Sequence, residues 1–279
     1  MLQTLFVVFV FVFATIQCCP QTLECNVVNA DTGEPLAFVN VGVVGKDVGT
    51  VTNETGTCKI ALVDSLYNDS LKFSMLGYSP VAFLVRDFVQ RAEHDNGLVE
   101  LKPTSYALRE VKVKPRKTKT RVLGRQTESR YVQAGFKSNQ LGCEAGVLVN
   151  VKKGSVAFVK SFSASVSNNE YDTLFFRLNI YSLKDGMPHE NILPHNVILR
   201  STVKSGVIHA NLESYNIVLE EDAVVSLEWI KDLGGTNGLF FSAVLGGGPV
   251  YYRHTSHGNW QKERMAGLGF WLTVEQETL

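Results

Sequence analysis

Short runs of apolar and β-branched residues, separated by turn residues, fill the chain from about residue 23 to residue 102. Examples are LECNVVN, AFVNVGVVG, GTCKIAL, SLKFSML, PVAFLV and GLVELK. Runs of this length, bounded by Gly, Pro, Asn and Asp, predict β-strands. Roughly six or seven strands in such a short stretch predict a small β-sandwich. Only DFVQRAEHD, residues 87–95, has the pattern of a helical turn.

Residues 126–279 show the same alternation with longer apolar runs. They include VAFVKSFSASVS, DTLFFRLNIYSL, AVVSLEWI and GLFFSAVLG, again separated by Gly, Asn, Asp and Pro. No segment of helix length shows a 3.6-residue period, so we expect roughly eight to ten antiparallel strands. The predicted fold class is therefore all-β, with a small sandwich followed by a larger antiparallel, jelly-roll-like sandwich.

Between the two predicted domains, residues 103–125 are rich in basic side chains and poor in apolar ones. Between Lys112 and Arg121 the basic residues are Lys112, Lys114, Arg116, Lys117, Lys119 and Arg121. A block of like charges repels itself and stays extended, which favours an interdomain linker. A basic surface for lipid head groups or for the acidic face of a partner is the alternative.

The chain begins with an uncharged apolar run from Leu5 to Ile16. This run is shorter than the roughly 20 residues of a membrane-spanning helix and fits the apolar part of a secretory signal peptide, so residues 1–22 predict export. Cys18 or Cys19, which follow the run, could instead carry a lipid anchor. The residue before them is not the small one expected at such a site, and cleavage without lipidation is favoured.

Cys25, Cys58 and Cys143 remain after the predicted signal peptide. An odd number of cysteines in an exported chain does not suggest a disulfide framework. Buried small apolar residues are the favoured interpretation, and a Cys25–Cys58 bridge stays open if their strands lie close together.

The formal charges balance, with 27 Lys and Arg against 27 Asp and Glu. A chain without a net positive field lacks the electrostatic footprint of a nucleic-acid-binding protein. We therefore expect no nucleic-acid partner.

Asp31-Thr32-Gly33 matches the motif that carries the catalytic carboxylate of aspartic proteases. Those enzymes need a second such carboxylate to share the proton, and the chain offers only Asn53-Glu54-Thr55-Gly56 and a turn at Asp185-Gly186. The Asp31 segment is better interpreted as a turn, in which the Asp31 side chain accepts backbone hydrogen bonds and Gly33 supplies a positive φ.

Other catalytic and metal-binding patterns are equally weak. The chain has no Gly-x-Ser-x-Gly motif, and its paired histidines, His254 with His257 and His189 with His195, lack a cysteine or carboxylate at ligand spacing. We expect no catalytic residue, no metal site and no cofactor.

Aromatic residues gather near the end of the chain and suggest a second kind of site. Tyr251, Tyr252 and Trp260 lie beside polar loop residues and are candidates for stacking on sugar rings. Core packing is the favoured alternative for this cluster, because aromatic side chains supply much of the buried area of any core.

Taken in order, VVNADTGEPLAFVNVGVVGKDVGTVTNETGTCKIAL, DSLKFSMLGYSPVAFLV and VELKPTSYALREVKVKP resemble the carboxypeptidase-regulatory-like domain. The resemblance covers about residues 23–114, and its turns fall at Asp31, Gly33, Asn53, Gly56 and Gly77. It implies a transthyretin-like, or prealbumin-like, seven-stranded sandwich. It implies no peptidase activity, because the family takes its name from its position beside catalytic domains.

Similar domains head many exported proteins of bacteria that have an outer membrane. The resemblance therefore implies a location in the periplasm or at the outer membrane, as a lipoprotein if Cys18 or Cys19 is modified. We expect a non-enzymatic binding or scaffolding protein whose partner is an envelope protein. A glycan-binding C-terminal sandwich is the alternative, followed by a hydrolase whose residues meet only in three dimensions.

Overall fold

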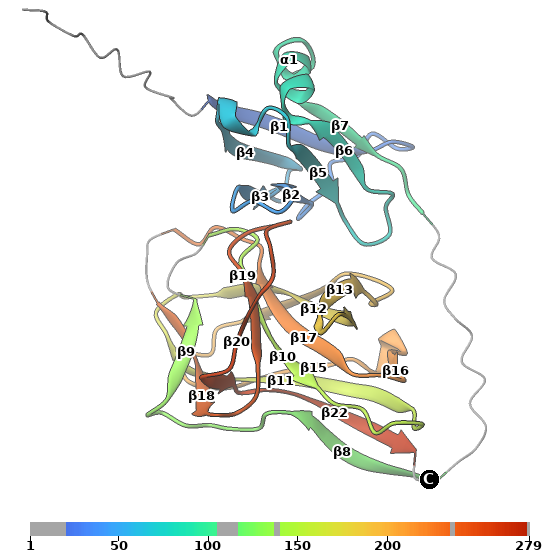
Figure 1. Cartoon of the computed structure of the whole chain (residues 1–279), viewed down its shortest axis with the longest axis vertical. Coiled ribbons are helices and arrows are strands. Elements are labelled where there is room, and N and C mark those ends of the chain that lie inside the picture. Colours follow the sequence, from blue (N-terminus) through green and yellow to red (C-terminus); the bar gives the residue numbers. More distant parts are fainter. Residues whose placement is uncertain (1–20, 105–116, 137–139, 235–237, 278–279) are drawn as a thin grey trace, which may run out of the picture.

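The computed structural model describes residues 21–104, 117–136, 140–234 and 238–277. These residues form two β-sandwiches, each with its own hydrophobic core, stacked one above the other in Figure 1. The predicted signal peptide through residue 20, Cys18 and Cys19, and the linker residues 105–116 lie outside the described residues. Within the described part of the chain, no helix is long and apolar enough to cross a membrane.

The N-terminal domain contains seven strands in two sheets, as predicted. The strands are β1 (Gln21–Asn29), β2 (Asn40–Val43), β3 (Gly49–Val51), β4 (Thr57–Leu62), β5 (Ser70–Ser74), β6 (Val81–Leu84) and β7 (Leu98–Leu101). One sheet has the order β4-β1-β7 and the other β3-β2-β5-β6. The β1–β7 pair is parallel and the other pairs are antiparallel.

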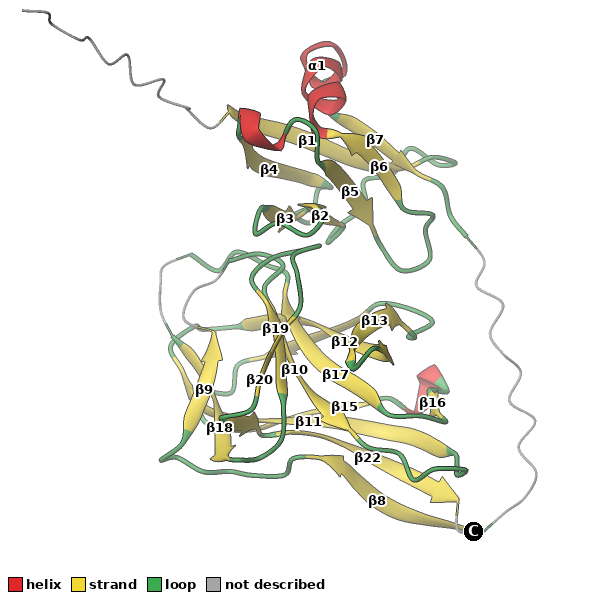
Figure 2. Cartoon of the chain, viewed as in Figure 1, coloured by secondary structure: helices red, strands yellow, loops and turns green. Residues whose placement is uncertain are grey.

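Helix α1 (Val85–Asp95) is longer than the single turn that the sequence suggested. Its buried residues, Val85, Phe88 and Val89, lie on one face because they are three and four positions apart. The Phe88 ring packs on Phe73 of β5, with ring centroids 5.4 Å apart. The helix, drawn in red at the top of Figure 2, therefore covers the end of the small core.

Cys25 and Cys58 lie directly opposite each other on β1 and β4 and form a disulfide, with their Cα atoms 5.2 Å apart. The favoured interpretation from sequence, two unlinked buried cysteines, is therefore wrong about the bond and right about the burial. Strand pairing brought them together across 33 residues of chain, which spacing alone could not show. Cys143 is free and buried.

The turn after β1 has a different side-chain acceptor from the one expected. Asn29 Oδ1 accepts hydrogen bonds from the backbone N–H of Asp31 at 2.8 Å and of Thr32 at 3.4 Å, whereas Asp31 itself is exposed. Gly33 has a φ of 70°, which glycine adopts without strain. Asp31 therefore lies in a turn, as predicted, but Asn29 stabilises it.

The turn before β4 follows the same principle. Asn53 Oδ1 accepts from the backbone N–H of Thr55 at 2.9 Å and of Thr57 at 3.0 Å. Gly56 has a φ of 75°, and a Cβ there would lie 2.7 Å from the Val27 carbonyl oxygen. Gly77, with a φ of 86°, forms the turn between β5 and β6.

The C-terminal domain is built from strands β8 to β22. They are β8 (Thr118–Gly124), β9 (Gln133–Phe136), β10 (Glu144–Val149), β11 (Ala157–Asn169), β12 (Leu174–Lys184), β13 (Met187–Asn191), β14 (Val197–Ser201), β15 (Gly206–Asn211), β16 (Val218–Leu219), β17 (Ala223–Trp229), β18 (Leu239–Leu245), β19 (Val250–Arg253), β20 (Gln261–Glu263), β21 (Ala266–Leu268) and β22 (Phe270–Glu277).

These strands form two antiparallel sheets that face each other. One runs β13-β12-β17-β10-β19-β20, with β14 also on β12, and the other runs β21-β18-β11-β22-β8, with β15 and β16 on β11 and β9 on β18. Large aromatic side chains fill the space between them; Phe241 and Phe270, for example, pack edge to face with ring centroids 4.7 Å apart. The predicted larger antiparallel sandwich is confirmed.

The basic segment ends earlier than the sequence suggested. Residues 118–124, expected to be linker, form β8 at the edge of the eight-stranded sheet and pair with β22 from Trp271 to Glu277. Most of the β8 side chains are exposed, and Leu123 is buried. Lysine and arginine are suited to an edge strand, because their charge discourages pairing with another chain. The like-charge pattern therefore belongs partly to a strand.

The two domains contact each other through both apolar and polar groups. Val51 of β3 is buried with Phe175 of β12 and Ile230, and Phe38 packs against this cluster. Phe38 has a φ of 62°, which is unusual for a bulky side chain and marks a backbone that its surroundings hold in place. Lys231 Nζ lies 2.9 Å from Glu54 Oε1 across the same junction.

The closest approach between the domains is at the loop that follows β19. A Cβ at Gly49 would lie 2.6 Å from the Ser256 carbonyl oxygen, and one at Gly42 would lie closer still. Asn259 Nδ2 donates to the Gly45 carbonyl oxygen at 2.9 Å. Glycine at positions 42 and 49 therefore allows β2 and β3 to dock on this loop.

Candidate functional site: the interdomain cleft

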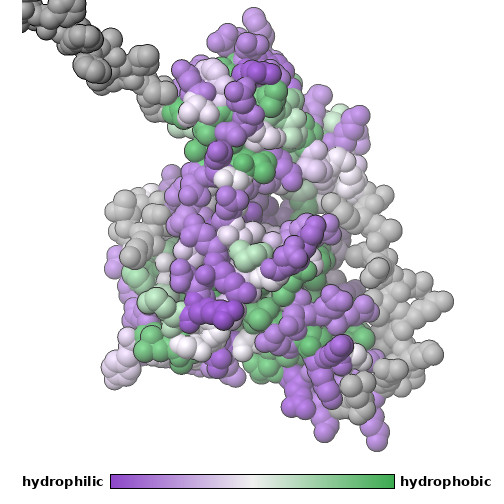
Figure 3. Space-filling view, in the orientation of Figure 1, coloured by the Kyte–Doolittle hydropathy of each residue, from purple (hydrophilic) through white to green (hydrophobic). Residues whose placement is uncertain are grey.

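A cavity of about 480 Å³ lies between the two domains. The N-terminal domain contributes Asn40, Lys72, Ser74 and Tyr78, among others. The C-terminal domain contributes β12 residues, the His189–Asn191 segment, Arg253 and His257. We call this cavity the interdomain cleft. In the space-filling view, hydrophilic residues cover much of the junction between the domains (Figure 3).

Four charged side chains form a row across adjacent strands at the cleft wall. Strand register places Arg253 of β19 opposite Glu144 of β10, Glu144 opposite Glu228 of β17, and Glu228 opposite Arg177 of β12. Arg177 Nε lies 2.9 Å from Glu228 Oε2, and Arg253 Nη2 lies 2.6 Å from Glu144 Oε2. Both carboxylates have no exposed side-chain area, and the two guanidinium groups are 3% and 9% exposed. We call these residues the charged row.

Neutral side chains join the two ion pairs into one network. Asn179 Nδ2 donates to Glu144 Oε1 at 2.8 Å and to Glu228 Oε2 at 3.0 Å. The hydroxyl of Ser226 donates to Glu144 Oε1 at 2.5 Å, and that of Tyr181 donates to Glu144 Oε2 at 3.2 Å. Glu228 Oε1 is buried and accepts no hydrogen bond from the described residues. A network of this kind keeps its side chains in defined positions, because each lost partner leaves a buried charge.

The network perturbs the acid–base behaviour of its members. Burial is the main reason why the pKa of Tyr181 lies well above its usual value, and the neighbouring Glu144 raises this pKa further. Burial alone would lower the pKa of Arg253, but Glu144, Tyr181 and Glu228 together raise it. Arg253 and Tyr181 therefore keep their protons across the physiological pH range.

The charged row reaches the N-terminal domain through Arg177 and the cleft histidine His257. Arg177 Nη2 donates to Asn40 Oδ1 at 2.5 Å. The His257 ring lies 3.3 Å, Nε2 to Oγ, from Ser74, and its carbonyl oxygen accepts from Gly45 N at 3.0 Å. Burial, followed by the charge of Arg253, lowers the pKa of His257 to about 3. His257 is therefore a neutral imidazole at the junction.

A family model described as the CarboxypepD_reg-like domain matches residues 23–113. These residues form a CarboxypepD_reg-like domain. The match contains the β1–β7 sandwich and leaves the C-terminal sandwich unassigned. No curated protein matched this chain.

The CarboxypepD_reg-like domain supplies one wall of the cleft, and the unassigned sandwich supplies the charged row. The surfaces that face the cavity carry Lys72 together with amides, hydroxyls and imidazoles. Such groups donate and accept hydrogen bonds in fixed directions. The arrangement therefore suits a polar ligand held by several hydrogen bonds at once.

The Ser74–His257 contact resembles the pairing of a nucleophile with its base. A general base works best when its pKa is near the working pH, and a pKa of about 3 makes His257 a poor acceptor for the Ser74 proton. The pair is better explained as a contact between the CarboxypepD_reg-like domain and the C-terminal domain.

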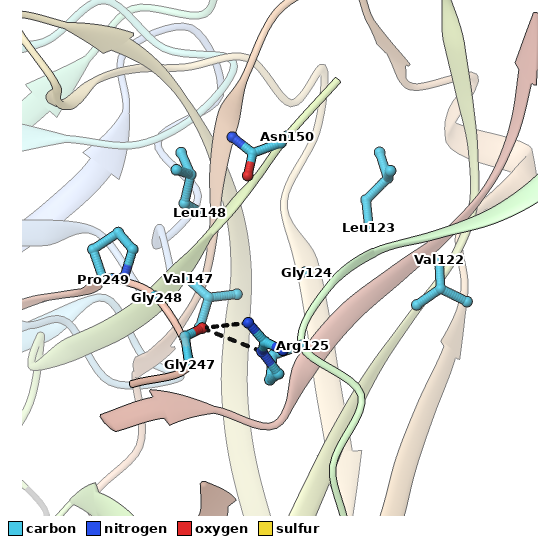
Figure 4. Close-up of a pocket in the computed structure, with 10 residues that line it drawn as sticks. All are labelled: Val122, Leu123, Gly124, Arg125, Val147, Leu148, Asn150, Gly247, Gly248 and Pro249. Carbon is cyan, nitrogen blue, oxygen red and sulfur yellow. Dashed lines mark hydrogen bonds between the residues drawn. The ribbon is translucent and has the colours of Figure 1, made fainter. Parts of the chain in front are cut away.

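A smaller cavity of about 270 Å³ lies beside β8 and β10 (Figure 4). Its principal charged group, Arg125, points at the Gly247 carbonyl oxygen, to which Nη2 donates at 3.0 Å. Asn150 on the opposite side donates to Asp222 at 2.8 Å. Because these polar groups are already engaged by the protein, this cavity is a weaker candidate than the interdomain cleft.

Of the three aromatic residues proposed for sugar stacking, Tyr251 and Trp260 pack in one cluster and Tyr252 lies on the other side of β19. Tyr251 is 1% exposed and packs in a small cluster with Tyr181 and Val224. Tyr252 packs on the opposite side of the strand, against the main core of the sandwich. Trp260 is half-buried, with Arg253 4.9 Å from its ring centroid. They form no shared platform, and glycan binding through them stays a prediction.

The remaining histidine candidates are divided between two cavities. His189 and His257 line the cleft, and His254 borders a different cavity. Burial, followed by Glu228 and Glu144, raises the pKa of the free Cys143 thiol, which therefore stays protonated. Within the residues that the structure describes, no group of three or more His, Cys, Asp and Glu could hold a metal ion.

Sequence reasoning missed the charged row. Arg177 and Glu228 each interrupt an otherwise apolar strand, in LFFRLNIY and AVVSLEW. A charged residue in such a run is expected to be buried, and buried charges need a partner. That signal could have marked both positions, although it could not have shown which residues pair.

Proposed function

We propose that this protein is a non-enzymatic, exported component of a bacterial cell envelope that binds a partner in the interdomain cleft. The observation that carries the proposal is the charged row. It holds Arg177, Asn179 and Arg253 in defined positions on one wall of a cavity whose other wall is the CarboxypepD_reg-like domain. Ligand sites are common at domain interfaces and depend on a few polar groups held in place.

Export and location rest on the sequence. The apolar run from Leu5 to Ile16 fits a secretory signal peptide, and the disulfide between Cys25 and Cys58 suits an oxidising compartment. We propose the periplasm or the outer membrane, with a lipid on Cys18 or Cys19 as one route to membrane attachment.

A binding role accounts for the cleft better than a hydrolytic one. Glu144 and Glu228 are each buried and bonded to a guanidinium group and to Asn179, so both carboxylates are already engaged by the protein. His257 is too weak a base to activate Ser74. If Ser74 were a nucleophile, an alkyl fluorophosphonate would label it in the wild type and not in Ser74→Ala, and we expect no label on Ser74.

Site-specific photo-crosslinking tests the binding proposal. A photoreactive benzoylphenylalanine replaces His189, which lines the cleft, and in a matched control it replaces the exposed His94 of α1. We expect a defined adduct from His189 in native envelopes, absent from His94 and lost when Lys72→Ala is added. Equal adducts from both positions, or none from His189, would contradict the proposal.

A glycan is the second candidate ligand, because the cleft presents planar polar side chains of the kind that bind hydroxyl groups, including Asn191, Glu190 and His189. A glycan array separates the two sites that could be used. Loss of binding in Asn191→Ala with retention in Tyr252→Ala would assign the glycan to the cleft. The reverse result would assign it to the aromatic surface predicted from sequence.

A further inference from the structure

A cavity of about 460 Å³ lies at one end of the C-terminal sandwich, between the edges of its two sheets. Strands β9 and β21 form one side, and β10 and β19 form the other. The Glu144–Arg253 ion pair separates this cavity from the interdomain cleft, and Arg253 borders both cavities. The proposed function makes no use of this cavity.

The lining changes character from the inside to the opening. Phe136, Ala145 and Leu268 are buried and apolar, and Val250 and Tyr252 are partly buried. Gln140, His254 and Glu263 are exposed and polar and therefore lie where the cavity meets solvent. The site thus has a mostly apolar interior, closed on one side by the Glu144–Arg253 ion pair, and a hydrogen-bonding rim.

An exposed apolar side chain also lies at the opening of the cavity. Met265 borders the cavity and is 79% exposed, although it is a large apolar side chain. Methionine is flexible and adapts to ligands of different shape. An exposed apolar side chain beside an apolar opening is stabilised when a ligand covers both.

We propose that this cavity binds a single-chain amphiphile, with the acyl chain inside and the polar head at the rim formed by Gln140, His254 and Glu263. The volume lies within the range of about 300–1,000 Å³ typical of small-molecule sites and is too small for a folded partner. The two-part lining selects an amphiphile over a wholly polar or a wholly apolar molecule.

Displacement of a fluorescent probe tests the proposal on the full chain. The apolar dye N-phenyl-1-naphthylamine is titrated into the wild type and then displaced with laurate or monolauroyl glycerol, both below their micelle concentrations. Laurate is a free fatty acid and monolauroyl glycerol is an uncharged monoacyl lipid, so comparing them shows whether the head group must be charged. We expect both to displace the dye, whereas their four-carbon homologues do not.

Filling the cavity with a side chain is the second arm. Ala266→Trp places an indole at the lining and should weaken dye binding by about tenfold or more. Ala82→Trp, on the exposed face of β6 in the other domain, is the matched control and should bind as the wild type does. If Ala266→Trp fails to fold, Ala134→Trp, at another lining position, takes its place.

No dye binding by the wild type, no displacement by either lauroyl compound, or equal binding by Ala266→Trp would each overturn the proposal.

Discussion

Removing Arg177 tests the role of the charged row in stability. Arg177→Met keeps an unbranched, flexible side chain and leaves the Glu228 carboxylate, which has no exposed area, without its guanidinium partner at 2.9 Å. Breaking a buried ion pair from one side costs about 3–5 kcal/mol. The bond from Asn179 to Glu228 remains in this variant, so the cost arises from the lost counter-charge.

The size of the effect can be checked through the C-terminal domain alone. The 3 tryptophans, Trp229, Trp260 and Trp271, all lie in that domain, so their fluorescence reports its unfolding in urea. For a domain of this size, a loss of about 3–5 kcal/mol corresponds to a fall in Tm of about 6–20 °C.

Two further variants make the reasoning refutable. Arg177→Met combined with Glu228→Gln removes both charges and should regain about 2 kcal/mol or more relative to Arg177→Met alone. Lys160→Met breaks an exposed pair with Glu213 in the same domain and should cost less than about 1 kcal/mol. The reasoning fails if Arg177→Met costs no more than Lys160→Met, or if the double variant is no more stable than the single one.

Three other predictions follow from the structure. Replacing Cys25 and Cys58 by serine should lower the free energy of unfolding of the N-terminal domain by about 2–4 kcal/mol, measured by circular dichroism in urea, whereas Cys143→Ser should not. Gly42→Ala should separate the domains and raise the radius of gyration in small-angle X-ray scattering, because its Cβ would clash with the Ser256 carbonyl oxygen; Gly154→Ala, where a Cβ meets nothing within 4 Å, should leave it unchanged. His257 has a folded-state pKa of about 3, below its unfolded value of about 6.5, so the unfolded chain binds more protons between these pH values and stability falls as the pH drops through that window. His257→Asn, which tolerates the φ of 61°, should reduce this loss between pH 7 and pH 4.5.

The sequence predicted the small sandwich because strands such as β4 alternate between buried and exposed residues. It predicted the larger one because strands such as β17 are buried on both faces and therefore form apolar runs. It failed where one pattern fits two structures. Lys119 and Arg121 match an extended linker and also an edge strand, and only the pairing with β22 decides between them. Asn29 and Asp31 are both suited to the turn after β1, and the backbone geometry selects Asn29.

The cleft was beyond sequence reasoning for a different reason. Arg253 and Glu144 are 109 residues apart, and Arg177 and Asn40 are 137 residues apart. Such pairs depend on strand register and on domain docking, neither of which leaves a local pattern. The sequence does show that partners are needed, because Arg177 and Glu228 are charged residues in mostly apolar strands.

The close approach of Gly42 and Gly49 to Ser256 also bears on how this chain could have evolved. Small β-sandwich domains are often exchanged between proteins as independent modules, which requires only a permissive linker. Here a replacement domain would also need glycine at the two positions that correspond to Gly42 and Gly49. The two halves of this chain are therefore expected to be inherited as a pair, and recombination at the linker would select for glycine at both positions.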